Sequence, residues 1–238
     1  MRFSGELSTP LGWVDDPMAC ALHLLGAAWF GWQALQLVRR AGDARRRGAA
    51  LAIFTGSAVV VLGTSAVYHA LPATNAWKPL FQRLDHSAIF VLIAGTLTAY
   101  HAVGFRGRAR WWMVGGVWLA TAAAVAGKLA LWSSLGDGAG LALYVGISAL
   151  GLSSILFLPR KLPWEGYALM GAGGLVYVGG ALLDQAGLVW IVPGVFGPHE
   201  IFHTAVLTAL VLHWRFFHEW AAPGRVPEPQ AAPVLQGI

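Results

Sequence analysis

Long apolar stretches separated by short polar breaks dominate the chain. Seven stretches are each about 20 residues long, the length that an α-helix needs to cross the hydrocarbon core of a bilayer. The breaks between them hold prolines, glycines and clusters of arginine. Such residues end membrane helices and face water. The pattern predicts an all-α, polytopic membrane protein, a seven-transmembrane helix bundle. The expected helices cover residues 17–38, 49–71, 84–103, 111–131, 138–158, 166–186 and 199–220.

The two ends of the chain differ from this membrane domain, which spans residues 17–220. Residues 1–16 form a polar segment of mixed charge and show no pattern of a cleavable signal peptide. Residues 221–238 are rich in proline and lack apolar periodicity, which predicts a disordered tail. We expect no second domain.

Composition and charge support a membrane location. Of 238 residues, 57% are hydrophobic and 11% are charged, whereas a soluble domain has about 25% charged residues. Twelve basic residues fall in the odd-numbered loops and the C-terminal end, and three fall on the opposite side. The positive-inside rule then places the C-terminus in the cytoplasm, with a bacterial inner membrane as the expected location. The formal net charge of +5 is thus an orientation signal rather than a nucleic-acid surface.

Candidate metal ligands lie at the ends of two apolar stretches. His69 ends the second stretch, and His199 and His203 begin the seventh with the i, i+4 spacing that chelates metals on a helix. Cys20 is the only cysteine, so a metal would take nitrogen and oxygen ligands. Connections from even to odd helices all lie on one side, which brings the three histidines to one membrane face. The alternative is that the imidazoles only form hydrogen bonds between helices.

Further polar residues are expected at the same face. Three imidazoles and a water would form the open tetrahedral site of a catalytic Zn²⁺, which lowers the pKa of that water to about 7. Asp85, expected at the start of the third helix, could orient the water or move its proton, or could only cap the helix. Ser65 could donate a hydrogen bond to an oxyanion or could only pack between helices. His23 begins the first helix on the same side and could lie beside the site.

Three sequence blocks together resemble the haemolysin III branch of the progestin and adipoQ receptor (PAQR) family. The blocks are Ser65-Ala-Val-Tyr-His69, Leu84-Asp85-His86-Ser87 and His199-Glu200-Ile-Phe-His203. The run His23-Leu-Leu-Gly26 is similar to the first-helix signature of that family. The resemblance implies a seven-helix bundle that holds zinc through His69, His199 and His203. It also implies that Asp85 acts through the metal-bound water, that Ser65 is the family's serine, and that the chain is related to ceramidase-type hydrolases.

The sequence therefore predicts a zinc-dependent membrane hydrolase that cleaves an amide or ester bond of a lipid-like substrate. One alternative is a receptor or sensor in which zinc is structural and joins three helices. A second is a haemolysin-type pore, although a pore should place polar residues along whole helix faces and here they gather at one end. The expected partner is a membrane lipid, with no nucleic acid, and no pattern indicates the oligomeric state.

Overall fold

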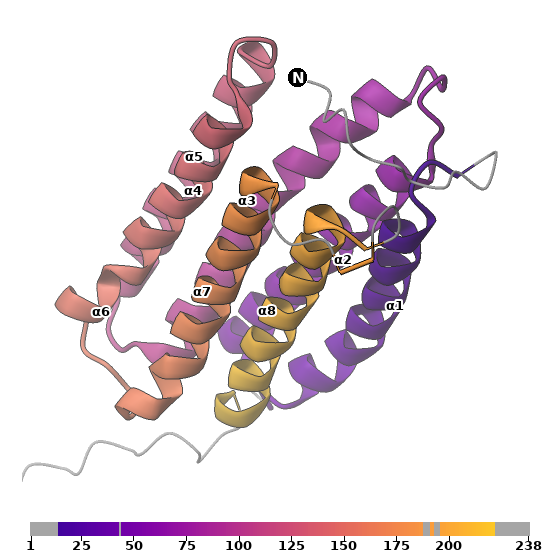
Figure 1. Cartoon of the computed structure of the whole chain (residues 1–238). Helices are drawn as coiled ribbons and strands as arrows, with labels where there is room; N and C mark the ends of the chain where they lie inside the picture. Colours follow the sequence, from indigo (N-terminus) through magenta and orange to yellow (C-terminus); the bar gives the residue numbers. More distant parts are fainter. Residues whose placement is uncertain (1–13, 43, 188–190, 193–195, 222–238) are drawn as a thin grey trace, which may run out of the picture.

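The computed structural model describes residues 14–42, 44–187, 191–192 and 196–221, which form an all-α structure (Figure 1). The predicted disordered tail, apart from Ala221, lies outside the described residues. Within these residues, seven long helices and one single-turn helix follow one another. They are α1 (Pro17–Arg39), α2 (Arg45–Ala70), α3 (Lys78–Gly104), α4 (Ala109–Ala130), α5 (Asp137–Leu152), α6 (Ser154–Phe157), α7 (Trp164–Ala186) and α8 (Pro198–Trp220).

Six of these segments are long and apolar enough to cross a membrane, with α5 and α6 together forming one of them. The remaining long helix, α8, has 23 residues, as α1 and α7 do. It carries four histidines, two glutamates and an arginine, which lower its hydropathy. These helices together confirm the predicted seven-helix membrane bundle.

The start of α3 differs from the prediction. The helix begins at Lys78, six residues before the expected position, and Trp77 is its N-cap. Pro79 in the first turn is compatible with this start because a proline there removes only an N–H group that the helix leaves unbonded. Asp85 therefore lies two turns inside α3, and the prediction that it begins or caps the helix is wrong. An apolar window misses this extension because Lys78 and Arg83 are charged.

The fifth expected helix is interrupted near its end. Ser153 separates α5 from α6, and the hydroxyls of Ser153 and Ser154 donate hydrogen bonds to the carbonyls of Leu150 and Gly151. Serine hydroxyls that bond to the preceding helical turn favour a bend. The change in direction at Ser153 follows from this local competition for backbone carbonyls.

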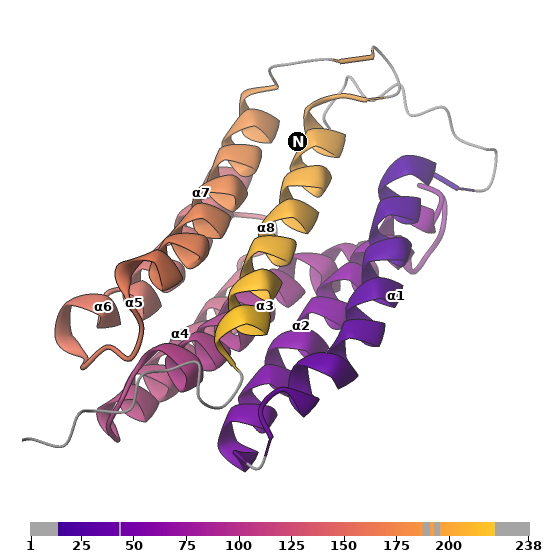
Figure 2. The ribbon, with the colours of Figure 1, turned by 90° about the horizontal axis from the view of Figure 1, so that it is seen from below.

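The helices form a bundle (Figures 1 and 2), and its two ends differ in how side chains fill them. Helices α1, α2 and α3 pack in chain order, and α8 contacts both α1 and α7. The most completely buried aromatic side chains include Phe54, Phe216 and Phe217, which pack near the end where α2 begins and α8 ends. Toward the other end the bundle surrounds a cavity of about 2540 Å³. The cavity reaches the face at which α2 ends and α8 begins.

A tight approach between α2 and α3 gives a test of this packing. A methyl group added at Gly95 would lie 2.3 Å from the hydroxyl oxygen of Ser57 and 3.2 Å from the carbonyl oxygen of Ile53. We expect Gly95→Ala to push the helices apart and to lower the unfolding free energy by about 1–3 kcal/mol. The measurement is thermal unfolding in detergent, with Gly56→Ala as the control because an added methyl there meets no atom within 4 Å. Equal midpoints for the two variants would contradict the packing.

Candidate metal centre

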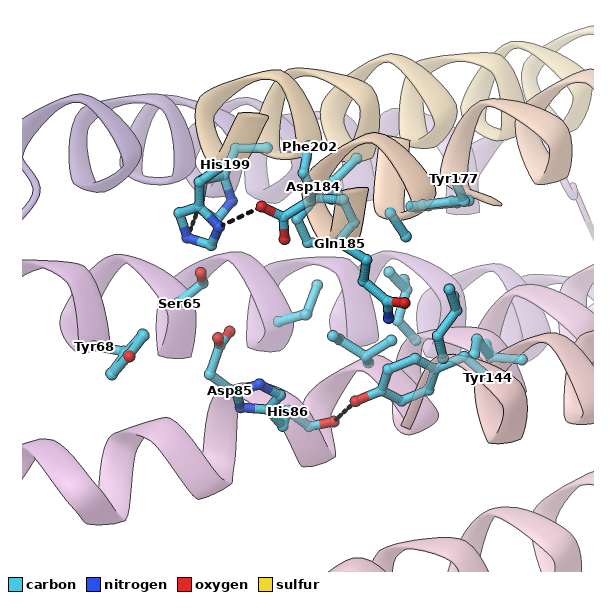
Figure 3. A pocket seen from close by; sticks show the side chains of 18 of the residues that line it. Ser65, Tyr68, Asp85, His86, Tyr144, Tyr177, Asp184, Gln185, His199 and Phe202 are labelled. Carbon is cyan, nitrogen blue, oxygen red and sulfur yellow. Dashed lines mark hydrogen bonds and ion pairs between the residues drawn. The ribbon is translucent and has the colours of Figure 1, made fainter. Parts of the chain in front are cut away.

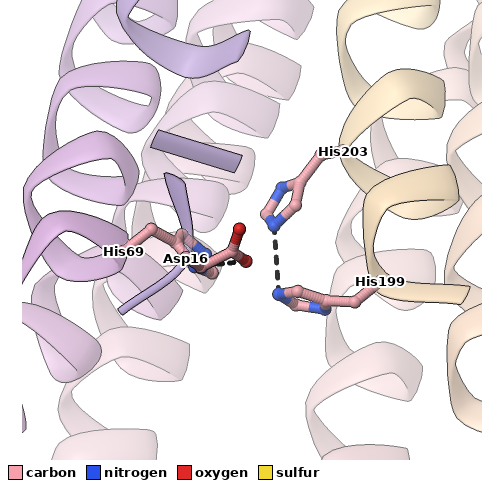
Figure 4. Close-up of side chains that lie close together, drawn as sticks. All are labelled: Asp16, His69, His199 and His203. Atoms are coloured by element: carbon pink, nitrogen blue, oxygen red, sulfur yellow. Dashed lines mark hydrogen bonds and ion pairs between the residues drawn. The ribbon is translucent and has the colours of Figure 1, made fainter. Parts of the chain in front are cut away.

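Four side chains from three segments of the chain converge at one face of the bundle (Figure 4). Asp16 is the N-cap of α1, His69 lies in the last turn of α2, and His199 and His203 lie in the first two turns of α8. Each residue offers one ligand atom, and these atoms all lie within 4.8 Å of one another. The structure thus brings together the three histidines that the sequence singled out and adds a carboxylate.

The start of α8 is built to present its two histidines. Pro198 occupies the first turn, and the Glu200 carboxylate accepts a hydrogen bond of 2.7 Å from the backbone N–H of Gly197. The Nε2 atoms of His199 and His203 lie 3.0 Å apart. Two ring nitrogens that face each other this closely are suited to a shared cation, and imidazoles with a carboxylate are ligands that zinc accepts. The four residues therefore fit a metal ion.

A carboxylate outside the cluster orients one of these imidazoles. The Oδ1 atom of Asp184, near the end of α7, lies 3.4 Å from Nδ1 of His199. A ring nitrogen held by a carboxylate in this way fixes the tautomer and leaves Nε2 for the metal. Asp184 thus ties α7 to the candidate metal centre.

Loss of the Asp184 carboxylate should weaken metal binding without removing a ligand. We expect Asp184→Asn to raise the dissociation constant of the metal by about 10–100-fold, the usual effect of losing such an outer partner. Competition with a chromophoric chelator measures it, and Glu219→Gln, in the last turn of α8, is the control. Unchanged affinity in Asp184→Asn would show that the contact does not orient His199.

Asp16 is the ligand candidate that sequence reasoning missed. One oxygen of its carboxylate accepts a hydrogen bond of 3.0 Å from the backbone N–H of Ala19, and the other lies 3.3 Å from Nδ1 of His69. Burial alone would raise the pKa of Asp16, but the hydrogen bonds from His69 and Ala19 outweigh burial and lower it. Asp16 is therefore ionised at neutral pH and can ligate a cation or hold His69 in place.

Hydrogen bonds hold the segment that carries Asp16 against the end of α2 and the start of α3. The backbone N–H of Asp16 donates to the carbonyl of His69 at 3.0 Å. The ammonium group of Lys78 lies 2.6 Å from a carboxylate oxygen of Asp15 and 2.6 Å from the carbonyl oxygen of Leu71. These contacts place the carboxylate of Asp16 reproducibly beside His69.

His23 of α1 lies directly behind the cluster, as the sequence suggested. Its ring centroid is 4.4 Å from that of His203, with the two planes nearly perpendicular, and 6.5 Å from that of His69. The side chain is buried, and neither ring nitrogen has a hydrogen-bond partner among the described residues. His23 does not belong to the four-residue ligand group.

Ser65 and Asp85 line the same cavity but do not belong to the ligand group. Ser65 is buried on α2 one turn before His69, and its hydroxyl interacts with the carboxylate of Asp85. In Figure 3 the Asp85 carboxylate points across the cavity toward His199, with Ser65 beside it. Asp85 also interacts electrostatically with His199.

His86 follows Asp85 in the chain but faces a different part of the cavity. Its Nδ1 atom lies 2.7 Å from the carbonyl oxygen of Gln82, and its ring meets the edge of Trp132 at a centroid distance of 5.3 Å. His86 does not belong to the four-residue ligand group among the described residues.

The cavity extends from the candidate metal centre into the apolar part of the bundle. Asp85 and Leu97 of α3 both line it, so that it follows about 18 Å of helix axis. Beyond the polar end its walls are mostly aliphatic, from α3, α5 and α7, and include Ile93, Ala149, Leu152 and Leu175. The site therefore joins a polar end, which holds the four candidate metal ligands, to a long apolar compartment.

Comparisons with known proteins agree with this geometry. Hemolysin-3 of Bacillus cereus is 31% identical over 105 residues, which cover 44% of this chain and 48% of that protein. The ADIPOR-like receptor IZH3 of Eremothecium gossypii is 28% identical over 176 residues, 67% of this chain and 41% of that protein. The chain thus spans about half of these relatives or less. A family model described as haemolysin-III related matches residues 11–214, which include all four candidate ligands. The chain belongs to the haemolysin-III related family, within the PAQR group of membrane proteins.

Proposed function

We propose that the protein is a zinc-dependent membrane hydrolase that cleaves an amide or ester bond of a lipid-like substrate. The observation that carries the proposal is the convergence of four metal-ligating side chains at the polar end of a 2540 Å³ cavity with apolar walls. A ligand pocket for a small molecule usually measures about 300–1,000 Å³. A cavity this large suits a substrate with long acyl chains.

The proposed division of labour follows from the positions of the residues. His69, His199 and His203 would hold the ion, and Asp184 would orient His199. A zinc ion bound there supplies Lewis acidity and a source of hydroxide near neutral pH. Asp85 lies inside the cavity and would accept the proton of the attacking water and return it to the leaving group. Ser65 would hold Asp85 in place and offer its hydroxyl to the developing oxyanion.

The apolar walls of the cavity support a substrate with an acyl chain. A substrate whose head group lies beside Asp85 would extend its acyl chain along Ile93 and Leu97. Burial of aliphatic surface gives about 25 cal/mol per Å², so a long acyl chain can supply most of the binding energy. A soluble ester with a short chain should therefore be a poor substrate.

From the distribution of basic residues between the loops on the two sides, we expect the proposed active site to face the outside of a bacterial inner membrane.

The function is tested with the full chain purified in detergent without chelator. Metal content by plasma mass spectrometry and hydrolysis of a fluorescent ceramide and a long-chain fluorescent ester are measured on the same preparation. We expect about one zinc per chain and turnover that stops when the metal is removed and returns when zinc is restored. A zinc-loaded preparation that hydrolyses neither amide nor ester would overturn the proposal.

A structural metal in a receptor or sensor is a second candidate, and Asp16 is the observation that favours it. Three histidines and Asp16 make four protein ligands, and closed sites of this kind are typical of structural zinc. If the carboxylate of Asp16 only holds His69, the fourth position stays open for water. The two roles of Asp16 therefore separate the two candidate functions.

The variant Asp16→Asn distinguishes these roles because it keeps the size of the side chain and removes its charge. For the hydrolase we expect zinc to stay bound through the three histidines, with affinity lowered by about 10–100-fold, the effect of losing an outer partner. Hydrolysis at saturating zinc should persist. For a structural site we expect loss of zinc together with a lower unfolding midpoint. Glu219→Gln is the control, since Glu219 lies in the last turn of α8, at the opposite membrane face from the ligand histidines.

A further inference from the structure

A second cavity, lined by basic side chains, lies at the opposite membrane face from the candidate metal centre. It measures about 370 Å³, and we call it the basic pocket. Arg47 of its lining and His69 of the metal centre lie about 33 Å apart along α2, by helical rise. The basic pocket is therefore independent of the proposed active site. Its lining consists of Ala44, Arg45, Arg46, Arg47, Ala102, Arg110, Trp111 and Lys161.

The charge in this pocket is concentrated and of one sign. Five of its lining residues are cationic, and none of the described lining residues carries a carboxylate. Burial, and then the like charges of Arg110 and Arg47, lower the pKa of Lys161 to about 8. Like charges gathered in this way repel one another, and a bound anion would relieve the repulsion.

Part of this charge serves the ends of neighbouring helices. Arg47 donates a hydrogen bond of 2.8 Å to the carbonyl of Ala221, just after α8, and Arg110 donates to the carbonyl of Phe105, just after α3. Cations near helix C-termini are favourable, so these bonds have a structural role. The carbonyls carry only partial charge and leave the pocket strongly positive. The buried Nε of Arg110 has no hydrogen-bond partner among the described residues.

Two helix N-termini open at the same pocket. Helices α2 and α4 begin there, neither start has a side-chain cap, and neither has an acidic residue in its first turn. The free N–H groups of a helix N-terminus favour an anion. Here the first turns hold Arg45 to Arg47 and Arg110 instead. The uncapped N–H groups and the guanidinium groups are therefore both suited to bind one anion.

The surroundings of the pocket indicate where the anion comes from. Trp111 belongs to the lining and its neighbour Trp112 is 84% exposed. Phe157, four residues before Lys161, is 77% exposed. Trp112 and Phe157 are thus exposed apolar side chains close in the chain to Trp111 and Lys161 of the lining. Basic pockets between membrane helices bind lipid head groups in this way.

We propose that the basic pocket binds the phosphate group of an anionic phospholipid from the membrane leaflet on that side. The phosphate would sit between the N-termini of α2 and α4 and accept hydrogen bonds from Arg46, Arg110 and Lys161. The acyl chains would lie against Trp112 and Phe157. A bound lipid would join α2, α4 and the connection between α6 and α7, three segments that meet at this pocket.

Native mass spectrometry of the full chain in detergent tests the proposal. The protein is titrated with phosphatidylglycerol, and parallel titrations use phosphatidylcholine and inorganic phosphate. We expect one tightly retained phosphatidylglycerol per chain and much weaker retention of phosphatidylcholine. Inorganic phosphate that binds as well as phosphatidylglycerol and displaces it would overturn the lipid assignment.

Paired variants separate the pocket from general surface charge. We expect Arg46→Gln/Lys161→Gln to bind phosphatidylglycerol about thirtyfold more weakly, since each basic side chain near an anionic lipid contributes about fivefold. The control Arg39→Gln/Arg215→Gln removes the same charge from exposed positions that do not line the pocket, and it should bind as the wild type does. Equal loss in both double variants would overturn the proposal. Should the first double variant fail to fold, Arg46→Gln alone changes only an exposed side chain and should show about a fivefold loss.

Discussion

Replacing His203 with alanine is expected to abolish zinc retention, from about one ion per chain to none after gel filtration. His203 is buried, and its Nε2 faces that of His199 at 3.0 Å. Loss of one of three imidazoles leaves a site with too few ligands for stable zinc binding. Hydrolysis should be lost with the metal, and added zinc should not restore it.

The matched control for this variant is His86→Ala. His86 also lines the cavity, but its ring faces Trp132 rather than the ligand cluster. We expect this variant to keep its zinc. Plasma mass spectrometry on both proteins, with an unfolding midpoint for each, separates loss of a ligand from loss of the fold. Full zinc content in His203→Ala would contradict the assignment of the metal centre to these residues.

Asp85→Asn is expected to keep the metal and lose the reaction. Asp85 lies outside the ligand group but inside the cavity, next to Ser65. A positioned general base contributes about 10²–10⁴-fold to a rate, and an amide cannot take up the proton. We therefore expect turnover to fall by that factor while zinc content stays at the wild-type value.

Two measurements on Asp85→Asn make this expectation specific. Hydrolysis is compared with that of Glu165→Gln, which makes the same chemical change in the first turn of α7, at the opposite membrane face. Metal affinity is measured in parallel. If Asp85→Asn loses zinc as His203→Ala does, Asp85 supports the metal rather than the proton transfer. Wild-type turnover in Asp85→Asn would exclude it as the base.

The membrane bundle and the histidine cluster could be predicted because both depend on simple periodic features. The length of an apolar run gives the span of a helix such as α4 within a few residues, since the thickness of the bilayer fixes it. The alternation of chain direction then decides which helix ends meet. That rule is enough to bring His69 at the end of α2 to His199 at the start of α8.

Asp16 and the start of α3 could not be predicted in this way because both lie at the membrane surface. There, hydropathy no longer separates helix from loop, and Lys78 can open a helix as readily as end one. Asp16 is an N-cap just before Pro17, a position that acidic residues often take for local reasons alone. Its contact with His69 depends on tertiary structure. The sequence signal was that Asp16 precedes a helix on the same side as the histidines.

The origin of the four ligand candidates has a consequence for the biogenesis of the protein. Asp16 precedes α1 and is synthesised well before His199 and His203, which emerge with α8. The metal can be captured by all four residues only after every intervening helix has been inserted in the correct direction. A bound ion would then join the start of α1, the end of α2 and the start of α8. The entropic cost of closing so long a loop between α2 and α8 is only slightly larger than that of closing a short loop.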